Sequence, residues 1–378
     1  MHAVEHDRTN AHFFLQGPSG TGKTFLYNGL CHHFRGRGRI VLCVASSGIA
    51  SLLLPGGRTA HSRFGIPLDI NESSTCSIPK NGQLADLIRQ TSLLIWDEVP
   101  MQNKYCFEAV HRTLADIRDD PSLFGGIPTV LGGDFAQILP VVPRGSREAT
   151  VQACIQRSFI WPQLKVLFLT ENMRIRTADE HNRAFLEWTQ RLSYDPEYYG
   201  LIELPPFVAR FEHFLDLIER VYPRALLAES GTVPDFFRTR SILASRNSSV
   251  REINHILIDR LPGETTEYLS EDKADLPEDG GEGGLPVEVL HSFEVNRLPS
   301  LRLRLKEGTP IMLLQNINPD VGLYNGTRLI VTRLGRNYIE AHGITGKASG
   351  EIHFIPRIKL TSDEKDLGFI LTRRQFPV

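Results

Sequence analysis

The chain has 378 residues, of which 41% are hydrophobic and 23% are charged, and its formal net charge is −2 at pH 7. This length and composition predict a globular protein of two or three domains. The near-neutral charge excludes a global basic field, so any nucleic-acid site has to be a local patch. No run of about 18 apolar residues occurs, and we expect no membrane-spanning helix and no membrane partner.

The most specific motif lies near the N-terminus, where an apolar run is followed by a glycine-rich loop and a helical stretch. The loop is Gly17–Thr24, and it lies between the strand-like His12–Leu15 and the helix-like Phe25–Phe34. The pattern GxxxxGK[ST] in that context predicts a nucleoside-triphosphate site, because backbone N–H groups and a helix N-terminus surround the phosphates. Lys23 is expected to reach the β- and γ-phosphates, and the Thr24 hydroxyl to ligate Mg²⁺. The expected nucleotide-binding residues are Gly17, Pro18, Ser19, Gly20, Thr21, Gly22, Lys23 and Thr24.

Continuously apolar, strand-like runs alternate with helical patterns from this loop to about residue 170. The strands are expected at 13–15, 40–44, 93–96, 128–131 and 166–169, and the helices at 25–34, 47–54, 104–118 and 151–159. Such alternation predicts an α/β fold with a parallel sheet that is covered by helices on both faces. Residues 67–83 are expected to form a loop or a small hairpin insertion.

Two carboxylates follow the third expected strand. Asp97 and Glu98 come directly after 93–96, at the edge of the sheet where phosphates lie in such folds. We expect Asp97 to hold Mg²⁺ and Glu98 to orient and deprotonate the attacking water. An apolar run that ends in Asp-Glu is a weak signal by itself, and the phosphate loop makes it a strong one.

Polar residues also follow the next two strands. Gln137 lies in the segment GGDFAQ and is expected to sense the γ-phosphate; the alternative is a solvated amide in a plain turn. Arg174 follows the fifth strand and is expected to clamp the γ-phosphate through its planar fork. A surface ion pair is the alternative for this arginine.

The second half opens with another strand-like and helical pair. A strand is expected at 241–244, a helix at 248–261, and short strands with turns at 309–314, 328–334, 337–342 and 352–360. The acidic, glycine-rich stretch 264–284 is opposed only by Lys273 and is expected to be a solvated or disordered loop rather than a metal site. The five cysteines show no CxxC spacing and are expected to be small buried residues.

Taken together and in this order, the motifs resemble those of the superfamily 1 helicases. The match is sharpest with the Pif family of superfamily 1B, and especially with the helicase portion of fungal Helitron-type elements. The resemblance covers nearly the whole chain, and it is carried by residues 17–24, 45–50, 57–64, 97–101, 133–140, 169–174, 323–328 and 373–378.

The resemblance implies an ATP-driven motor that moves 5′→3′ along single-stranded DNA and unwinds duplex or forked DNA, with ATP and Mg²⁺ as cofactors. It implies a RecA-like ATP-binding domain at 1–172, a helical connector at 173–240 and an incomplete second RecA-like domain at 241–378. A small β-barrel is expected within the last of these, at about 305–362. The resemblance further implies a monomer that serves DNA repair, recombination or telomere maintenance in the nucleus or the mitochondrion.

The segment 59–62, within the matching stretch 57–64, corresponds to a strand-gripping element of the family. The candidate DNA-binding residues are Arg58, Thr59, His61, Ser62 and Phe64, with Arg63 as a further basic candidate. Hydroxyls and an imidazole suit phosphate contacts, and Phe64 is expected to stack on a base. A lone histidine is more often a structural residue, so both interpretations of His61 stay open. Trp96 is expected to pack in the sheet rather than to stack on a base.

Two parts of the family pattern are missing. No glutamine-containing, adenine-reading segment precedes Phe13, and Val378 comes before the last two motifs, of which the second supplies an arginine to ATP. We expect poor ATP hydrolysis and inefficient unwinding by this polypeptide alone, because such an arginine is worth about 10³–10⁵ in turnover in related systems. The alternative function is a truncated module that binds ATP and single-stranded DNA without productive unwinding. A P-loop ATPase of another kind is disfavoured by 57–64 and by GDFAQ.

Overall fold

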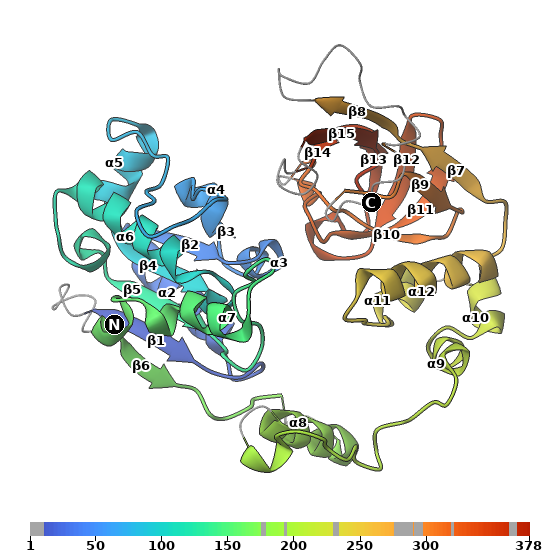
Figure 1. Ribbon diagram of the computed structural model, residues 1–378, viewed down its shortest axis with the longest axis horizontal. Coiled ribbons are helices and arrows are strands. Elements are labelled where there is room, and N and C mark those ends of the chain that lie inside the picture. Colours follow the sequence, from blue (N-terminus) through green and yellow to red (C-terminus); the bar gives the residue numbers. More distant parts are fainter. Residues whose placement is uncertain are drawn as a thin grey trace. The chain divides into compact units, whose positions relative to one another are not determined.

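The chain divides into two compact units, residues 1–208 and 209–378 (Figure 1). The computed structural model describes residues 11–174, 179–192, 195–229, 234–275, 290, 298–318, 321–362 and 369–378. The expected connector, 173–240, is shared between the two units. Within the described ranges, every helix is too short or too polar to cross a bilayer.

The first unit is built on a six-stranded parallel sheet of order β3-β2-β4-β5-β1-β6. Its strands are β1 (His12–Gln16), β2 (Ile40–Ala45), β3 (Arg58–Thr59), β4 (Thr91–Asp97), β5 (Thr129–Gly133) and β6 (Lys165–Phe168). Because the strands are parallel, the segments that follow β1, β4, β5 and β6 all emerge at one edge of the sheet. The expected α/β fold is confirmed.

Helices connect these strands or follow the last of them. They are α2 (Lys23–Arg35), α3 (Gly48–Leu52), α4 (Ala60–Phe64), α5 (Gln83–Arg89), α6 (Lys104–Arg118), α7 (Arg147–Ala153) and α8 (Glu180–Leu192). Single 3₁₀ turns are η2 (Val99–Met101), η3 (Leu123–Gly126), η4 (Ile155–Arg157), η5 (Trp161–Gln163) and η7 (Pro196–Tyr198).

The ends of two helices show how local residues set their bounds. Helix α6 has the predicted bounds, because the Asn103 side chain accepts from the Tyr105 N–H at one end and Asp119 is left-handed at the other. The helix expected at 151–159 is wrong in its bounds. Ser146 caps the first turn of α7, and the extended backbone of Cys154 ends it.

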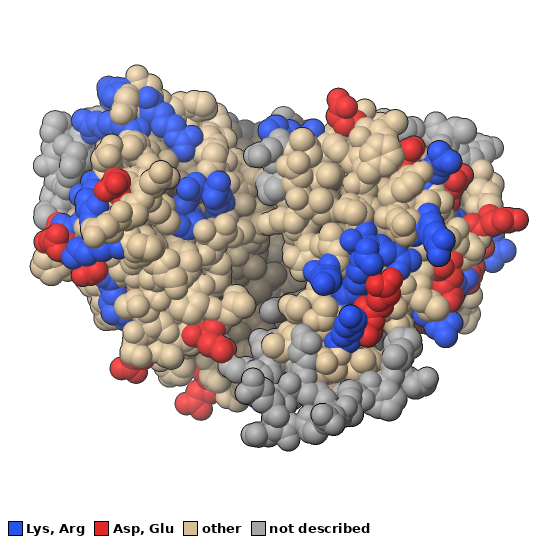
Figure 2. Space-filling model, turned by 90° about the horizontal axis from the view of Figure 1, so that it is seen from above, with Lys and Arg blue, Asp and Glu red and all other residues tan. Residues whose placement is uncertain are grey.

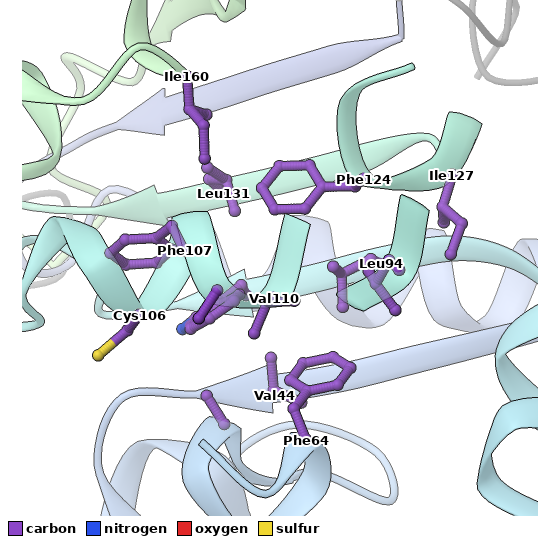
Figure 3. Packing of buried hydrophobic residues seen from close by; sticks show 14 of the residues in the cluster. Val44, Phe64, Leu94, Cys106, Phe107, Val110, Phe124, Ile127, Leu131 and Ile160 are labelled. Atoms are coloured by element: carbon purple, nitrogen blue, oxygen red, sulfur yellow. The ribbon is translucent and has the colours of Figure 1, made fainter. Parts of the chain in front are cut away.

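Alternate residues of β4 enter two separate cores, which is why the strand is continuously apolar. Leu93 and Ile95 pack in the core that contains the inner face of α2. Leu94 and Trp96 pack in the core that contains residues of α4, α5 and α6. Figure 3 shows Phe64, Phe107 and Val110 beside Val44 and Leu94 in this second core. Helices therefore cover both faces of the sheet, as predicted.

The second unit starts with helices and continues as antiparallel sheets. The helices are α9 (Phe214–Val221), α10 (Arg224–Glu229), α11 (Pro234–Arg238) and α12 (Asn247–Arg260). One sheet has the order β10-β11-β12-β13, a second β14-β15-β8, and a third pairs β7 with β9. The strands are β7 (Thr266–Leu269), β8 (Glu271–Asp275), β9 (Arg302–Leu305), β10 (Pro310–Met312), β11 (Arg328–Leu334), β12 (Tyr338–Gly343), β13 (Ile352–Pro356), β14 (Ile358–Thr361) and β15 (Ile370–Gln375), and η10 (Gly346–Ala348) follows β12.

The described part of the acidic stretch, up to Asp275, is not a loop. It forms β7 and β8, and the expectation of a solvated loop is wrong there because basic residues from distant strands neutralise its charges. Glu267 pairs with Arg302, Asp272 with Arg373 and Glu271 with Arg374. Within the stretch 264–284 Lys273 is the only basic residue, and the pairing arginines lie further along the chain. The rest of the stretch, 276–284, lies outside the described residues.

The strand expected at 241–244 is also wrong. These residues form no strand, and Leu243 is 91% exposed. All pairings between the named strands of the second unit are antiparallel in its described part. A parallel strand needs a neighbour that runs the same way, and the described residues provide none.

One smaller expectation is confirmed, since all five cysteines are buried as free thiols. Charged side chains of both signs lie in several separate groups on the face shown in Figure 2.

Candidate nucleotide and nucleic-acid site

The glycine-rich loop joins β1 to α2 and closes around the amino group of Lys23. Gly20 and Gly22 have φ angles of 87° and 93°, which favour glycine, and Gly22 is the residue from which α2 starts. Lys23 Nζ donates to the carbonyl oxygens of Gly17 at 2.6 Å and Pro18 at 3.2 Å. The amino group is thereby held inside the loop.

The two carboxylates predicted from sequence lie at the end of β4. Asp97 is 4% exposed and accepts a hydrogen bond of 3.2 Å from the Tyr27 hydroxyl. Glu98 is half-buried and has a left-handed backbone, with φ 54° and ψ 39°. For a non-glycine residue this conformation is strained, and such strain is most common at functional sites.

Burial and mutual repulsion shape the ionisation of this pair. Burial raises the pKa of Asp97, while Lys23 and the Tyr27 hydroxyl act in the opposite direction. Burial also raises the pKa of Glu98, and the neighbouring charges of Asp97 and Asp134 add to that rise. Lys23 stabilises both carboxylates electrostatically, which places it in the same cluster. A carboxylate whose pKa is raised is a better proton acceptor, as a general base requires.

Tyr27 was missed by the sequence analysis. It lies one helical turn after Lys23 on α2, fully buried, and this spacing was the available signal. A Cβ placed on Gly132 would lie 1.8 Å from the Tyr27 hydroxyl oxygen, so glycine at the end of β5 makes room for this side chain. A Cβ on Gly133 would lie 2.3 Å from Pro100 Cδ. Gly132 therefore makes room for Tyr27, and Gly133 makes room for Pro100, which follows the Asp97 strand.

Asp134 organises the loop that carries Gln137. Its carboxylate accepts from the Ala136 N–H at 3.0 Å and from the side-chain amides of Gln137 at 3.3 Å and Gln16 at 3.4 Å. Asp134 is 5% exposed, whereas Gln137 is exposed. Gln137 is thus held next to the carboxylate cluster on the side that is open to solvent.

The segment after β6 is bound to the phosphate loop. The Met173 N–H donates to the Gly20 carbonyl oxygen at 2.9 Å, and an Arg174 guanidinium nitrogen donates to Ser19 Oγ at 3.2 Å. A Cβ on Gly20 would lie 2.6 Å from Asn172 Oδ1, so the contact requires glycine. Arg174 therefore lies at the phosphate loop, where an arginine is needed to contact a γ-phosphate.

Residues 58–64, which include the strand-gripping segment, form β3 and α4 and differ in their accessibility. Thr59 caps α4 by accepting from the Ser62 N–H, and Ser62 and Arg58 are exposed. Burial lowers the pKa of Arg63, and the positive charge of Arg58 lowers it further, so two cations lie close together here. His61 is half-buried, and its ring nitrogen Nδ1 lies 3.1 Å from Gln102 Nε2.

The expectation that Phe64 stacks on a base is wrong in this fold. Its ring is fully buried and lies 6.0 Å from the Trp96 ring, which in turn packs 4.5 Å from Phe107. Trp96 is itself fully buried, as predicted. Phe64 anchors α4 to the sheet and presents no face to a ligand.

The donor set suits a nucleotide with a divalent cation. The Thr24 hydroxyl and the Asp97 carboxylate are hard oxygen donors of the kind that Mg²⁺ prefers. Lys23 and the N-terminus of α2 provide positive charge for phosphate oxygens. The buried Asp97, already hydrogen-bonded by Tyr27, is an acceptor-only group for which a bound cation would supply the missing charge.

A phosphate loop between an internal parallel strand and a helix, with paired carboxylates at the end of a second strand that one strand separates from it, defines a P-loop nucleotide-binding domain with a RecA-like sheet. The chain belongs to the PIF1-like helicase family, whose sequence model matches residues 1–194. The model of the DNA helicase Pif1 2B domain matches residues 288–334 in the second unit.

Individual relatives agree with this assignment. The chain is 26% identical over 326 residues to the ATP-dependent DNA helicase Pif1 of Psychrobacter sp., covering 85% of this chain and 44% of that protein. It is 27% identical over 338 residues to the ATP-dependent DNA helicase PIF7 of Trypanosoma brucei brucei, covering 86% and 32%. It thus spans less than half the length of these curated relatives.

The fold is similar to that of Pif1 helicase from Bacteroides in its crystal structure with ADP-AlF3 and single-stranded DNA. The TM-score is 0.64 at 21% identity, covering 100% of this chain and 79% of that chain. This likeness shows the shared fold.

Proposed function

We propose that this chain is the motor part of an ATP-dependent DNA helicase that moves 5′→3′ along single-stranded DNA and unwinds duplex or forked DNA. The observation that carries the proposal is the convergence of Lys23, Asp97, Glu98 and Arg174 on one phosphate loop. The family membership supports the nucleic-acid substrate.

The geometry supports the following roles. The Lys23 amino group, now held by the Gly17 and Pro18 carbonyls, would exchange these acceptors for phosphate oxygens of ATP. Thr24 and Asp97 would hold Mg²⁺, which supplies charge neutralisation of the phosphates. Glu98 would accept the proton of the attacking water at its carboxylate, and its raised pKa suits this task.

Arg174 and Gln137 would contact the γ-phosphate. Arg174 already donates to Ser19 in the loop, and Gln137 is held by Asp134 beside the carboxylates. Loss of the γ-phosphate would free both side chains, and each belongs to a segment that follows a strand of the sheet.

The DNA contacts would come from Arg58, Thr59, His61 and Ser62. Two of these side chains are exposed, and the neighbouring charge of Arg63 increases the local attraction for phosphates. Binding there should weaken as the salt concentration rises, because neutralised phosphates release counterions. The proposal includes action as a monomer, in the nucleus or the mitochondrion.

ATP hydrolysis by the purified chain, measured with and without single-stranded DNA, tests the proposal. Low turnover that is stimulated by DNA and abolished in Lys23→Ala is the expected result. A Glu98→Gln variant should keep ATP binding and lose about 10²–10⁴ in turnover. Equal turnover in Lys23→Ala would contradict the proposed site. ATP binding without DNA-stimulated turnover would indicate a binding module instead.

A further inference from the structure

A row of hydrogen bonds leads from the carboxylate strand β4 to the strand-gripping helix α4. Ser46 follows β2, and its N–H donates to the Asp97 carbonyl oxygen at 3.0 Å. The Trp96 indole N–H donates to Ser46 Oγ at 3.3 Å. The Ser46 hydroxyl has two acceptors in reach, Gln102 Oε1 at 3.1 Å and the Asp97 carbonyl oxygen at 3.3 Å, and it donates to the nearer one, Gln102. The amide oxygen of Gln102 is therefore held by Ser46, at the ends of β2 and β4.

The amide nitrogen of Gln102 faces the histidine of α4. Gln102 Nε2 lies 3.1 Å from His61 Nδ1. Because the amide oxygen already accepts from Ser46, the amide nitrogen is the group turned towards the imidazole, and it can only donate. Nδ1 then accepts, and in a neutral imidazole the proton lies on Nε2.

The environment favours the neutral imidazole. Burial lowers the pKa of His61 below its ordinary value. Gln102 itself is 6% exposed, so water does not compete for its amide. Among the described residues, His61 Nε2 has no hydrogen-bond partner, and the residue as a whole is half-buried.

We infer that Gln102 is a positioning residue that fixes His61 as the Nε2–H tautomer and aims this N–H as a donor to a phosphate oxygen of single-stranded DNA. This inference rests on the proposed function. Gln102 follows Asp97 and Glu98 closely in the chain. The inference therefore gives a residue beside the carboxylate pair the role of holding the histidine that contacts DNA.

The test compares Gln102→Leu with Gln90→Leu, a matched change at an exposed residue at the end of α5. In Gln102→Leu, the DNA concentration for half-maximal stimulation of ATP hydrolysis should rise about tenfold, since one hydrogen bond to an oriented donor is lost. Turnover at saturating DNA and the KM for ATP should stay within twofold of wild type. Gln90→Leu should match wild type in all three quantities.

A double variant separates positioning from stability. His61→Ala should weaken DNA binding, and Gln102→Leu should add nothing further once His61 is absent. Additive losses in the double variant would overturn the inference. A fall in saturating turnover with unchanged half-saturation would also overturn it, because Gln102 would then act on the nucleotide site.

The tautomer can be read directly and without DNA. The ¹⁵N chemical shifts of the His61 imidazole should show a proton on Nε2 in wild type and in Gln90→Leu, and a mixture of tautomers in Gln102→Leu. The same mixture in all three proteins would overturn the inference.

Failure of the proposed function gives a different pattern. If wild type shows no DNA-stimulated hydrolysis and no salt-dependent DNA binding, the helicase proposal and the phosphate contact of His61 both fail. The imidazole shifts would still decide whether Gln102 sets the tautomer. If wild type is stimulated and Gln102→Leu behaves like Gln90→Leu, only the positioning role fails.

Discussion

The Tyr27 hydroxyl donates a hydrogen bond of 3.2 Å to Oδ1 of Asp97, and so connects the helix of the phosphate loop to the carboxylate strand. The tyrosine reaches this position only because Gly132 leaves space beside it. Its own pKa is raised well above the ordinary value by burial and by the negative charge of Asp97, so the hydroxyl stays a donor at neutral pH. The contact therefore orients Asp97 without adding charge.

Removal of this hydroxyl tests its role. Tyr27→Phe should keep the fold and raise the Mg²⁺ concentration for half-maximal ATP hydrolysis about three- to tenfold, because Asp97 loses the donor that orients it. Titration of ATP hydrolysis with Mg²⁺ measures the change. Tyr105→Phe, a matched loss of a hydroxyl on α6, should leave the titration unchanged. Equal curves for both variants would show that the Tyr27 hydroxyl does not orient Asp97.

Two Gly-to-Ala changes should have opposite effects on stability. Gly132→Ala should destabilise the first unit by several kcal/mol, because the new Cβ overlaps the Tyr27 hydroxyl at 1.8 Å and the neighbouring backbone of β1 is close. Gly29→Ala, in α2 with nothing within 4 Å, should stabilise by about 0.5–1 kcal/mol through helix propensity. Denaturant unfolding measures both. A mild effect of Gly132→Ala would mean that Tyr27 can move aside.

Adjacent arginines on β15 should contribute very differently to stability. Arg373 pairs with Asp272 at 2.6 Å with side chains 2% and 0% exposed, and Arg374 pairs with Glu271 at 3.2 Å with side chains 51% and 64% exposed. Arg373→Met should cost about 3–5 kcal/mol, since it leaves a buried carboxylate unpaired. Arg374→Met should cost less than about 1 kcal/mol. Unfolding of the second unit measures both, and similar losses would contradict this account.

The stability of the first unit should fall in mild acid because of His12. This residue is 2% exposed, and both ring nitrogens are buried without a hydrogen-bond partner among the described residues. Burial, together with the charge of His111, lowers the pKa of His12 from 6.5 to about 4. Between pH 6.5 and about 4, His12 therefore binds a proton in the unfolded chain but not in the folded chain.

His12 therefore does not lower the free energy of unfolding above pH 6.5. As the pH falls towards 4, that free energy decreases by on the order of 3 kcal/mol in total because of His12. His12→Leu should flatten this part of the curve of unfolding free energy against pH. His32→Leu, an exposed histidine of α2, should leave the slope as it is. A slope that survives in His12→Leu would assign the effect to another group.

The elements that sequence predicted well were those specified by local pattern. The phosphate loop, the carboxylates after β4 and the strands of the parallel sheet all follow from glycine spacing and from apolar runs between helices. The bounds of α6 follow from its capping residues. In each case the residues that decide the structure are within a few positions of one another.

The features that were missed depend on contacts between distant residues. Tyr27 and Asp97 are 70 positions apart, and Gln102 and His61 are 41 positions apart. The strands of the acidic stretch needed arginines further along the chain, which are 35 positions away between Glu267 and Arg302 and 101 positions away between Asp272 and Arg373. The family resemblance predicts that Phe64 stacks on a base, and only the packing against Trp96 shows that its ring is internal.

Folding alone would select glycine at position 98. The left-handed backbone of Glu98 costs roughly 1 kcal/mol relative to a residue without a side chain, and its carboxylate is also partly removed from water. Glu98→Gly should therefore make the first unit harder to unfold while removing the proposed base. The sequence retains a side chain at position 98 although the backbone conformation there disfavours one. This indicates a position that is kept for chemistry at the expense of stability.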